Sequence, residues 1–206
     1  MKGSRIKPKW ILASASPRRK ELLSNLGLQF FTESSGIDEP PRLSHETPSR
    51  YAVRVAWLKA REVAGRHESG LILSADTIVV SRNRILGKPE SRADARRMIE
   101  RLSGRWHEVI TGICILECDR QRLLSTFKRT RVHFRKLSAA EIEWYLKSDE
   151  YRDKAGAYGV QGYASLFIDC IEGCYFNIVG FPVSAFERLC RKAGIELTQS
   201  LKILKS

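Results

Sequence analysis

Apolar runs of strand length recur along the chain and are separated by short polar or turn-rich segments. Runs rich in valine, isoleucine and aromatic residues are typical of buried β-strands. The pattern predicts strands at residues 10–14, from residue 30, and at 71–80, 106–117 and 122–134. The polar residues at 74–77 predict a kink that divides one of these strands, and residues 170–174 predict a hairpin turn.

Helical periodicity fills several of the intervals between these strands. The spacing of apolar residues predicts helices at residues 17–26, 49–64, 91–102, 138–147 and 182–193. Ser16 is the expected N-cap of the first helix, and Gly27 is its stop signal. Ser138 and Glu141 have the S-x-x-E spacing of a capping box. Strands and helices interleave early and strands pair as hairpins later, which predicts the α/β class with a mixed sheet flanked by helices.

Composition and charge narrow the class of protein. The chain has 206 residues, 43% of them apolar, which is enough for one large domain or two small ones. No apolar run approaches the ~20 residues of a membrane span, and the stretch after residue 9 is too short for a signal peptide. We therefore expect a cytoplasmic protein with no membrane partner. The net charge of +13 favours anionic partners such as nucleic acid, anionic lipid or phosphorylated small molecules.

The cysteines and histidines do not suggest a metal cluster. Five cysteines cannot all pair, and positions 114/118 and 170/174 have a C-x3-C spacing. Zinc sites more often use tighter pairs with a matching partner, so we expect these thiols to pack inside apolar strands. None of the four histidines forms a spaced pair, which argues against a histidine metal site or a Ser/His triad.

Residues 14–19 form a basic turn between the first strand and the first helix. The free backbone N–H groups and the positive end of the helix dipole make such a turn suitable for binding an anion, and the small Ser14 lets the anion approach. The guanidinium groups of Arg18 and Arg19 match phosphate oxygens. The alternative is a capped helix with two solvated arginines.

Three further segments contain residues with the chemistry of a site. Asp76, inside an apolar run, could bind a divalent cation or take a proton from water, or it could be a buried carboxylate satisfied by backbone amides. Lys88 projects from an extended backbone before a proline, although a lone lysine is usually a surface residue. In the glycine-rich segment 154–162, Tyr158 could stack on a base and Gln161 could bond to it. The alternative for that segment is an ordinary turn.

These segments together resemble the Maf family of nucleotide pyrophosphatases. The motifs that match are at residues 12–23, 36–39, 75–79, 87–89, 102–104, 107–112 and 154–162, in order and with few insertions. Several motifs in register are more specific than any one of them. The resemblance implies a Maf/ITPase-like fold, in which an elongated mixed sheet flanked by helices forms two lobes around a substrate cleft.

The resemblance also implies an activity and roles for named residues. Proteins of this family hydrolyse nucleoside triphosphates to the monophosphate and pyrophosphate with a divalent cation, here expected to be Mg²⁺ or Mn²⁺. Asp76 would be the catalytic base or a metal-linked carboxylate, and Glu39 would assist with the metal or the water. The triphosphate would be held by Arg19, Lys59 and Lys88, with Ser14 lining the turn.

Three positions separate the branches of the family. Arg18, Thr77 and Gln161 are similar to the set of the dTTP/UTP pyrophosphatases, whereas the branch acting on 7-methyl-GTP has an aromatic residue, Gln and Glu. A glutamine amide can match the alternating donor and acceptor of a uracil or thymine edge. Modified pyrimidine nucleotides such as 5-methyl-UTP stay open as substrates, because one methyl group is worth only ~1–3 kcal/mol. Nucleotide-pool house-cleaning and cell-division arrest are the roles implied.

The expected organisation is a basic leader at residues 1–9, one Maf-like domain at 10–197 and a tail at 198–206, with a homodimer left open. A second hypothesis is a non-catalytic nucleic-acid-binding or septum-formation regulator, which the charge supports. A pure binder has little reason to keep Asp76, Glu39 and Lys88, and aromatic residues are not interleaved with the basic clusters. Nucleic acid is therefore not an expected partner.

Overall fold

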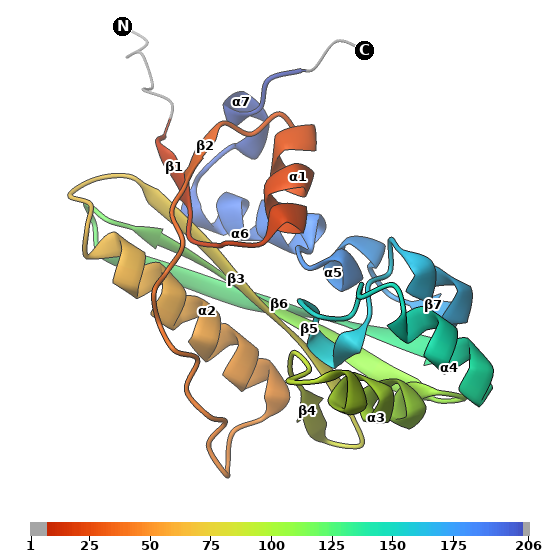
Figure 1. Cartoon of the computed structure of the whole chain (residues 1–206). Helices are drawn as coiled ribbons and strands as arrows, with labels where there is room; N and C mark the ends of the chain where they lie inside the picture. Colours follow the sequence, from red (N-terminus) through yellow and green to blue (C-terminus); the bar gives the residue numbers. More distant parts are fainter. Residues whose placement is uncertain (1–7, 204–206) are drawn as a thin grey trace, which may run out of the picture.

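One mixed β-sheet forms the centre of the protein in the computed structural model, which describes residues 8–203. Within those residues, seven strands take the order β2-β1-β3-β5-β6-β7, with β4 paired to the outer part of β3 (Figure 1). The strands are β1 (Trp10–Leu12), β2 (Phe30–Thr32), β3 (Leu71–Ser81), β4 (Arg84–Leu86), β5 (Trp106–Glu117), β6 (Arg122–Phe134) and β7 (Ile168–Glu172). β1 is parallel to β2 and β3, and the other pairings are antiparallel.

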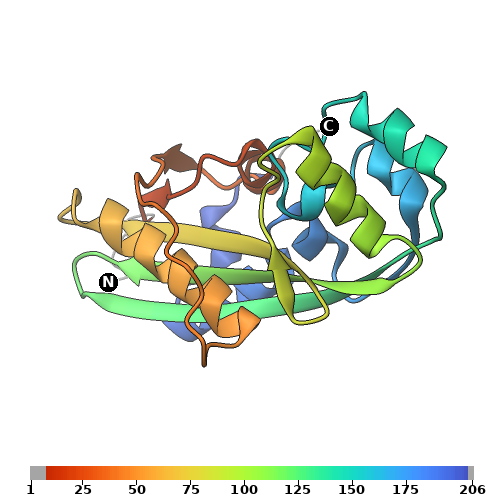
Figure 2. The same ribbon diagram turned by 60° about the horizontal axis from the view of Figure 1, so that its bottom comes forward.

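Helices cover both faces of this sheet. They are α1 (Pro17–Asn25), α2 (Pro48–Ala64), α3 (Arg92–Leu102), α4 (Ala139–Leu146), α5 (Tyr175–Val179), α6 (Val183–Ala193) and α7 (Leu197–Ser200), with 3-10 turns η1 (Ala155–Ala157) and η2 (Tyr163–Phe167). α2 packs along one face, on alternate residues of β3 such as Ile72 and Ile78 (Figure 2). The opposite face is covered by the other long helices. The predicted α/β class with a helix-flanked mixed sheet is confirmed.

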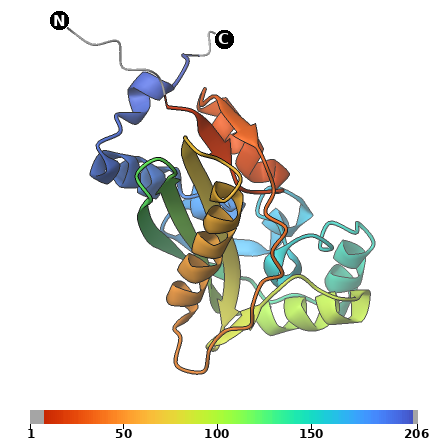
Figure 3. The same cartoon turned by 90° about the vertical axis from the view of Figure 1, so that its left-hand side faces the viewer.

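The face opposite α2 carries two separate hydrophobic cores. One core joins α1 and α6 to β1 and the first half of β3, with Leu23 and Leu73 among its buried residues. The other joins α3 and α4 to the second half of β3 and the end of β6, around Phe134. The α1 end and the α3–α4 end lie apart along the sheet in two orthogonal views (Figures 1 and 3). A cavity of about 890 Å³ is lined by residues from both ends.

Two local predictions are wrong. The kink at residues 74–77 is absent, because β5 pairs with every residue of β3 from Leu71 to Val80 and keeps the strand continuous. Residues 170–174 do not form a hairpin: β7 runs through Glu172, Gly173 turns the chain at a φ of +127°, and α5 begins at Tyr175. Of the cysteines expected to pack, those at 114 and 118 are buried, whereas Cys170 is exposed.

The two ends of the chain were predicted as a leader and a tail. Residues 1–7 of the leader and 204–206 of the tail lie outside the described residues. α7 begins at Leu197, and Leu201 forms a β-bridge with Leu28, so this part of the tail contacts the α1 end of the domain. Across residues 8–203, the structure contains no helix that is both long and apolar enough to span a membrane.

Candidate active site

The cavity opens at the edge of β3 between two short partner strands. β1 pairs with residues 71–73 of this edge and β4 with residues 79–81, so 74–78 face no strand there among the described residues. Chain crossovers at such points leave a crevice beyond the carboxyl ends of parallel strands. β1 ends at Leu12, and the chain then passes through residues 13–16 into the N-terminus of α1. The sheet topology thus places Asp76 and the basic turn beside the same opening.

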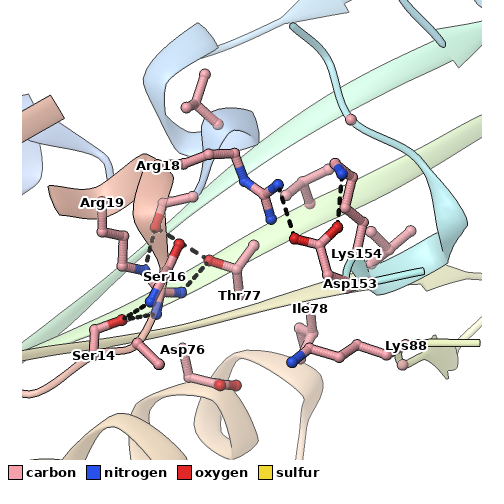
Figure 4. A pocket seen from close by; sticks show the side chains of 18 of the residues that line it. Ser14, Ser16, Arg18, Arg19, Asp76, Thr77, Ile78, Lys88, Asp153 and Lys154 are labelled. Carbon is pink, nitrogen blue, oxygen red and sulfur yellow. Dashed lines mark hydrogen bonds and ion pairs between the residues drawn. The ribbon is translucent and has the colours of Figure 1, made fainter. Parts of the chain in front are cut away.

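Arg19 is held rigidly at the base of the basic turn, with only 8% of its surface exposed. Its Nε donates to the Gly180 carbonyl at 2.9 Å, Nη1 to Ser14 Oγ at 3.0 Å and Nη2 to Thr77 Oγ1 at 3.0 Å (Figure 4). Burial lowers the pKa of Arg19, although a guanidinium stays charged in proteins. All three acceptors are neutral oxygens, so the positive charge is available to an anion in the cavity. The alternative of two solvated arginines is wrong for Arg19.

Asp76, Lys59 and Glu39 form one ionic cluster on the α2 side of β3. Lys59 Nζ donates to Asp76 Oδ1 at 2.7 Å and to Glu39 Oε1 at 2.6 Å. Asp76 is buried, and burial raises its pKa although the Lys59 ammonium opposes the shift. Its second oxygen, Oδ2, is buried and has no hydrogen-bond partner among the described residues. Asp76 is therefore paired with a lysine rather than satisfied by backbone amides.

The acidic residues fit a divalent cation that shares its ligands with a substrate. Mg²⁺ is usually held by one or two carboxylates together with phosphate oxygens and water. Asp76 offers the unpartnered Oδ2, and Glu39 is exposed at the mouth of the cavity. The part of the chain that the structure describes holds no group of three or more His, Cys, Asp or Glu side chains placed for a metal. A substrate triphosphate would complete the donor set.

The opposite wall of the cavity carries Lys88 and the glycine-rich segment. Lys88 is exposed and extends from the loop after β4 toward Asp76 (Figure 4). Gln161 is exposed and lines the cavity. Tyr158 lines the cavity but is buried: its hydroxyl lies 2.8 Å from His107 Nε2, and its ring packs edge-on against Phe134. Most of the ring belongs to the hydrophobic core, and stacking of Tyr158 on a base stays a prediction.

Arg18 connects the two walls through a residue that sequence reasoning missed. Its Nη1 lies 3.5 Å from Asp153 Oδ2, and Lys154 Nζ donates to Asp153 Oδ1 at 2.7 Å (Figure 4). All nine residues predicted for the site line this cavity: Ser14, Arg18, Arg19, Glu39, Lys59, Asp76, Thr77, Lys88 and Gln161. Glu150 and Asp153 line it as well. The sequence indicated these two residues only by their position, shortly before the glycine-rich segment.

Comparison with known proteins agrees with this arrangement. The family described as Maf-like protein matches residues 9–193. A dTTP/UTP pyrophosphatase of Syntrophomonas wolfei is 46% identical over 92% of this chain and 100% of its own length. Proteins of the same name from Clostridioides difficile and Pyrococcus furiosus are 47% and 41% identical over 88% and 94% of this chain, and over 93% and 97% of theirs. Because the family model matches most of the chain and these relatives are 41–47% identical over 88% or more of it, the chain belongs to the Maf family.

Proposed function

We propose that this chain is a nucleoside triphosphate pyrophosphatase that hydrolyses dTTP and UTP to the monophosphate and pyrophosphate. The observation that carries the proposal is the buried Asp76 carboxylate, which lines a cavity together with Arg19, Lys59 and Lys88 and whose Oδ2 has no hydrogen-bond partner among the described residues. A polyphosphate brings the negative charge that these cations neutralise, and the carboxylate is positioned to act on a water. The relatives named dTTP/UTP pyrophosphatase support the same activity.

The reaction needs a water oxygen to attack the α-phosphorus while the bond to the β-phosphate oxygen breaks. Asp76 is the proton acceptor: Oδ2 has a free lone pair, and Lys59 holds Oδ1 so that the carboxylate cannot rotate freely. The proton of the attacking water passes to Asp76. Pyrophosphate leaves with the negative charge that Arg19 and Lys88 stabilise.

A divalent cation is part of the proposal. Asp76 and Glu39 would hold it, together with phosphate oxygens of the substrate. When bound, the cation neutralises charge on the triphosphate and polarises its phosphoryl oxygens. Lys59 holds both carboxylates within hydrogen-bond distance of one ammonium, which keeps them together before the substrate arrives.

We assign recognition of the base to the cavity wall that carries the glycine-rich segment. Gln161 is exposed at the cavity, where its amide can both donate to and accept from the edge of uracil or thymine. Thr77 has a structural task in addition, because its hydroxyl contacts Arg19, Thr111 and the Gly180 carbonyl. A 5-methyl group is tolerated at such an edge, so 5-methyl-UTP belongs to the proposed substrate class.

The test is a nucleotide panel with purified protein in Mg²⁺ or Mn²⁺. Pyrophosphate and inorganic phosphate are measured separately for dTTP, UTP, 5-methyl-UTP, CTP, dATP and GTP. We expect pyrophosphate release that is fastest for the uracil and thymine nucleotides and absent after chelation. Release of inorganic phosphate alone, or no turnover of dTTP and UTP above background, would refute the proposal.

A further inference from the structure

Two glycines of the glycine-rich segment leave room for the side chains of neighbouring residues. A Cβ at Gly162 would overlap the carboxylate of Glu150, and a Cβ at Gly159 would lie 2.7 Å from Lys154 Cε. Neither position has the left-handed backbone that calls for glycine: Gly162 has a φ of −110°. The close approach in this segment is therefore between the loop at residues 159–163 and the side chains of Glu150 and Lys154.

Glu150 is half-buried inside the curve of that loop. Its Oε2 accepts the backbone N–H of Tyr163 at 2.7 Å, and its Oε1 accepts the Tyr145 hydroxyl at 3.4 Å. The single Tyr145 hydroxyl proton is shared with the Ala157 carbonyl, which lies closer at 3.0 Å and connects the start of the segment to α4. Within the loop itself, Gly162 N–H bonds to the Gly159 carbonyl at 3.3 Å. A carboxylate that accepts a backbone N–H makes a charge-assisted hydrogen bond, which is stronger than one between two neutral groups.

Gln161 is the exposed residue between these two glycines, and its neighbour Val160 is buried. The backbone on both sides of Gln161 is thus fixed, while its amide is left at the cavity. A loop fixed in advance loses little conformational entropy when a ligand binds. A shift of about 1 Å in a group that reads a substrate can reduce the rate about 100-fold.

We propose that Glu150 is a positioning residue for base recognition: its carboxylate fixes the loop at residues 159–163 and so places Gln161 against the pyrimidine. The inference rests on the proposed function and adds to it a residue that acts through another. Glu150 touches the loop, whereas Gln161 touches the base. The role predicts an effect on substrate choice and KM, with chemistry at the phosphates preserved.

The first test compares Glu150→Ala and Glu150→Gln with Asp149→Asn. Asp149 is the matched control, because it is an exposed neighbouring acid that pairs with Arg152 and does not contact the loop. For Glu150→Ala we expect KM for UTP to rise about tenfold and the preference for UTP over CTP in kcat/KM to fall about tenfold, with kcat changed little. Glu150→Gln keeps an oxygen acceptor for the Tyr163 N–H. Its KM for UTP and its preference for UTP over CTP should therefore be close to those of the unmodified chain. Asp149→Asn should match the unmodified chain.

Hydrogen exchange measures the loop without any turnover. Peptides that contain residues 159–163 should exchange faster in Glu150→Ala than in the unmodified chain or in Asp149→Asn. Unchanged exchange would overturn the anchoring role of Glu150, and faster exchange with an unchanged UTP/CTP preference would overturn its role in specificity. If the unmodified chain releases no pyrophosphate, the proposed function fails, and the exchange result still shows separately whether Glu150 anchors the loop.

Gly162→Ala tests the same contact independently of Glu150→Ala. Gly162→Ala retains Glu150 but places a methyl group where its carboxylate lies, so the same loss of UTP preference is expected. Glu150→Ala provides the space that this methyl group needs. In the double variant the two losses should therefore not add, which is the signature of residues in contact. Additive losses would contradict the proposed contact.

Discussion

Two buried charged side chains, Arg19 and Asp76, flank the cavity with partners of different kinds. Arg19 is fixed by three neutral oxygens, so its position is set by the fold and its charge is left for a ligand. Asp76 shares Lys59 with Glu39, so its own charge is only partly compensated. Arg19 is therefore a fixed cation that can bind phosphate, whereas Asp76 is a carboxylate with one oxygen that has no hydrogen-bond partner among the described residues. Substitutions at the two positions should have different effects.

Asp76→Asn tests the carboxylate with little change in size. The amide cannot accept the proton of the attacking water, so we expect kcat for UTP to fall about 10²–10⁴-fold. Lys59 keeps Glu39 as a partner, and the fold should survive. Pyrophosphate release and a thermal melt by circular dichroism measure the two effects.

The matched control for this substitution is Asp38→Asn, at an exposed acid beside Glu39 that does not line the cavity. It should leave both kcat and the melting temperature unchanged. Activity of Asp76→Asn within a few-fold of the unmodified chain would remove Asp76 from the catalytic role.

At the scale of elements, β5 links the sheet to both the cavity and α2. Gly112 on β5 lies against α2, where a Cβ would overlap the backbone of Ala52 and Val53. α2 in turn carries Lys59 to Asp76. The distance between this helix and the sheet therefore sets the position of the ionic cluster.

Gly112→Ala should displace α2, because the atoms it meets are backbone and cannot rotate away. Overpacking of this kind costs about 1–3 kcal/mol of the free energy of unfolding, and we also expect kcat to fall as Lys59 moves. Gly36→Ala is the control, because a Cβ at Gly36 meets nothing within 4 Å. Urea unfolding of the two variants measures the difference, and equal stability would show that α2 adapts without cost.

His107, also on β5, provides a pH-dependent contribution to stability. Burial lowers the pKa of His107 to about 4, whereas an unfolded histidine has a pKa near ~6.5. The unfolded chain therefore takes up a proton between these values while the folded chain does not. The stability due to neutral His107 is complete well above pH ~6.5 and falls as the pH decreases toward 4, by about 1.5 kcal/mol between pH 6.5 and 5.

Urea unfolding at several pH values isolates this contribution by comparison with His107→Gln. A glutamine stays neutral and can still bond to the Tyr158 hydroxyl, so its stability should depend less on pH over this window. The two curves should approach each other as the pH falls. Parallel curves would mean that His107 does not set the pH dependence.

Several elements could be predicted from sequence because their signals are local. β5 and β6 have the predicted bounds, since two long strand-like runs are separated by a clear turn, and the capping box at Ser138 and Glu141 is present. The kink at 74–77 failed because pairing with β5 outweighed local polarity. Ser16 is the N-cap residue of α1, as expected, but its side chain makes no capping hydrogen bond. The failed kink shows that a tertiary contact can outweigh a local signal.

The site was less predictable, because its geometry depends on long-range pairing. Lys59 and Asp76 are 17 positions apart, and nothing in either local sequence indicates that one ammonium joins Asp76 to Glu39. The resemblance to the Maf family identified these residues, whereas the contacts came only from the fold. Tyr158 and Glu150 show the limit: a glycine-rich pattern indicates close approach without showing what approaches.

At the scale of the whole molecule, the sheet face opposite α2 carries two hydrophobic cores, and residues from both ends line the cavity. Arg19 and Asp76 belong to the side near β1, whereas Lys88 and Gln161 lie on the side near β4 and η1. The Arg18–Asp153 pair connects the two sides, but an exposed ion pair of this kind contributes only about 0–1 kcal/mol. A triphosphate held by both sides would add a far stronger connection.

Ligand-dependent stability therefore tests the arrangement of the molecule as a whole. With only Asp76 and Glu39 as protein ligands, Mg²⁺ alone should bind weakly and leave the melting temperature nearly unchanged. A non-hydrolysable UTP analogue with Mg²⁺ should raise it, because at 100 times Kd a ligand stabilises the folded state by about 3 kcal/mol, or roughly 5–10 °C for a chain of this size. Chelation should remove most of that shift, and Glu39→Gln should reduce it. If Mg²⁺ alone produced the full increase in melting temperature, the cation would have a binding site made by the protein alone. If the increase survived chelation, the lysine and arginine side chains of the two walls would hold the triphosphate without a metal.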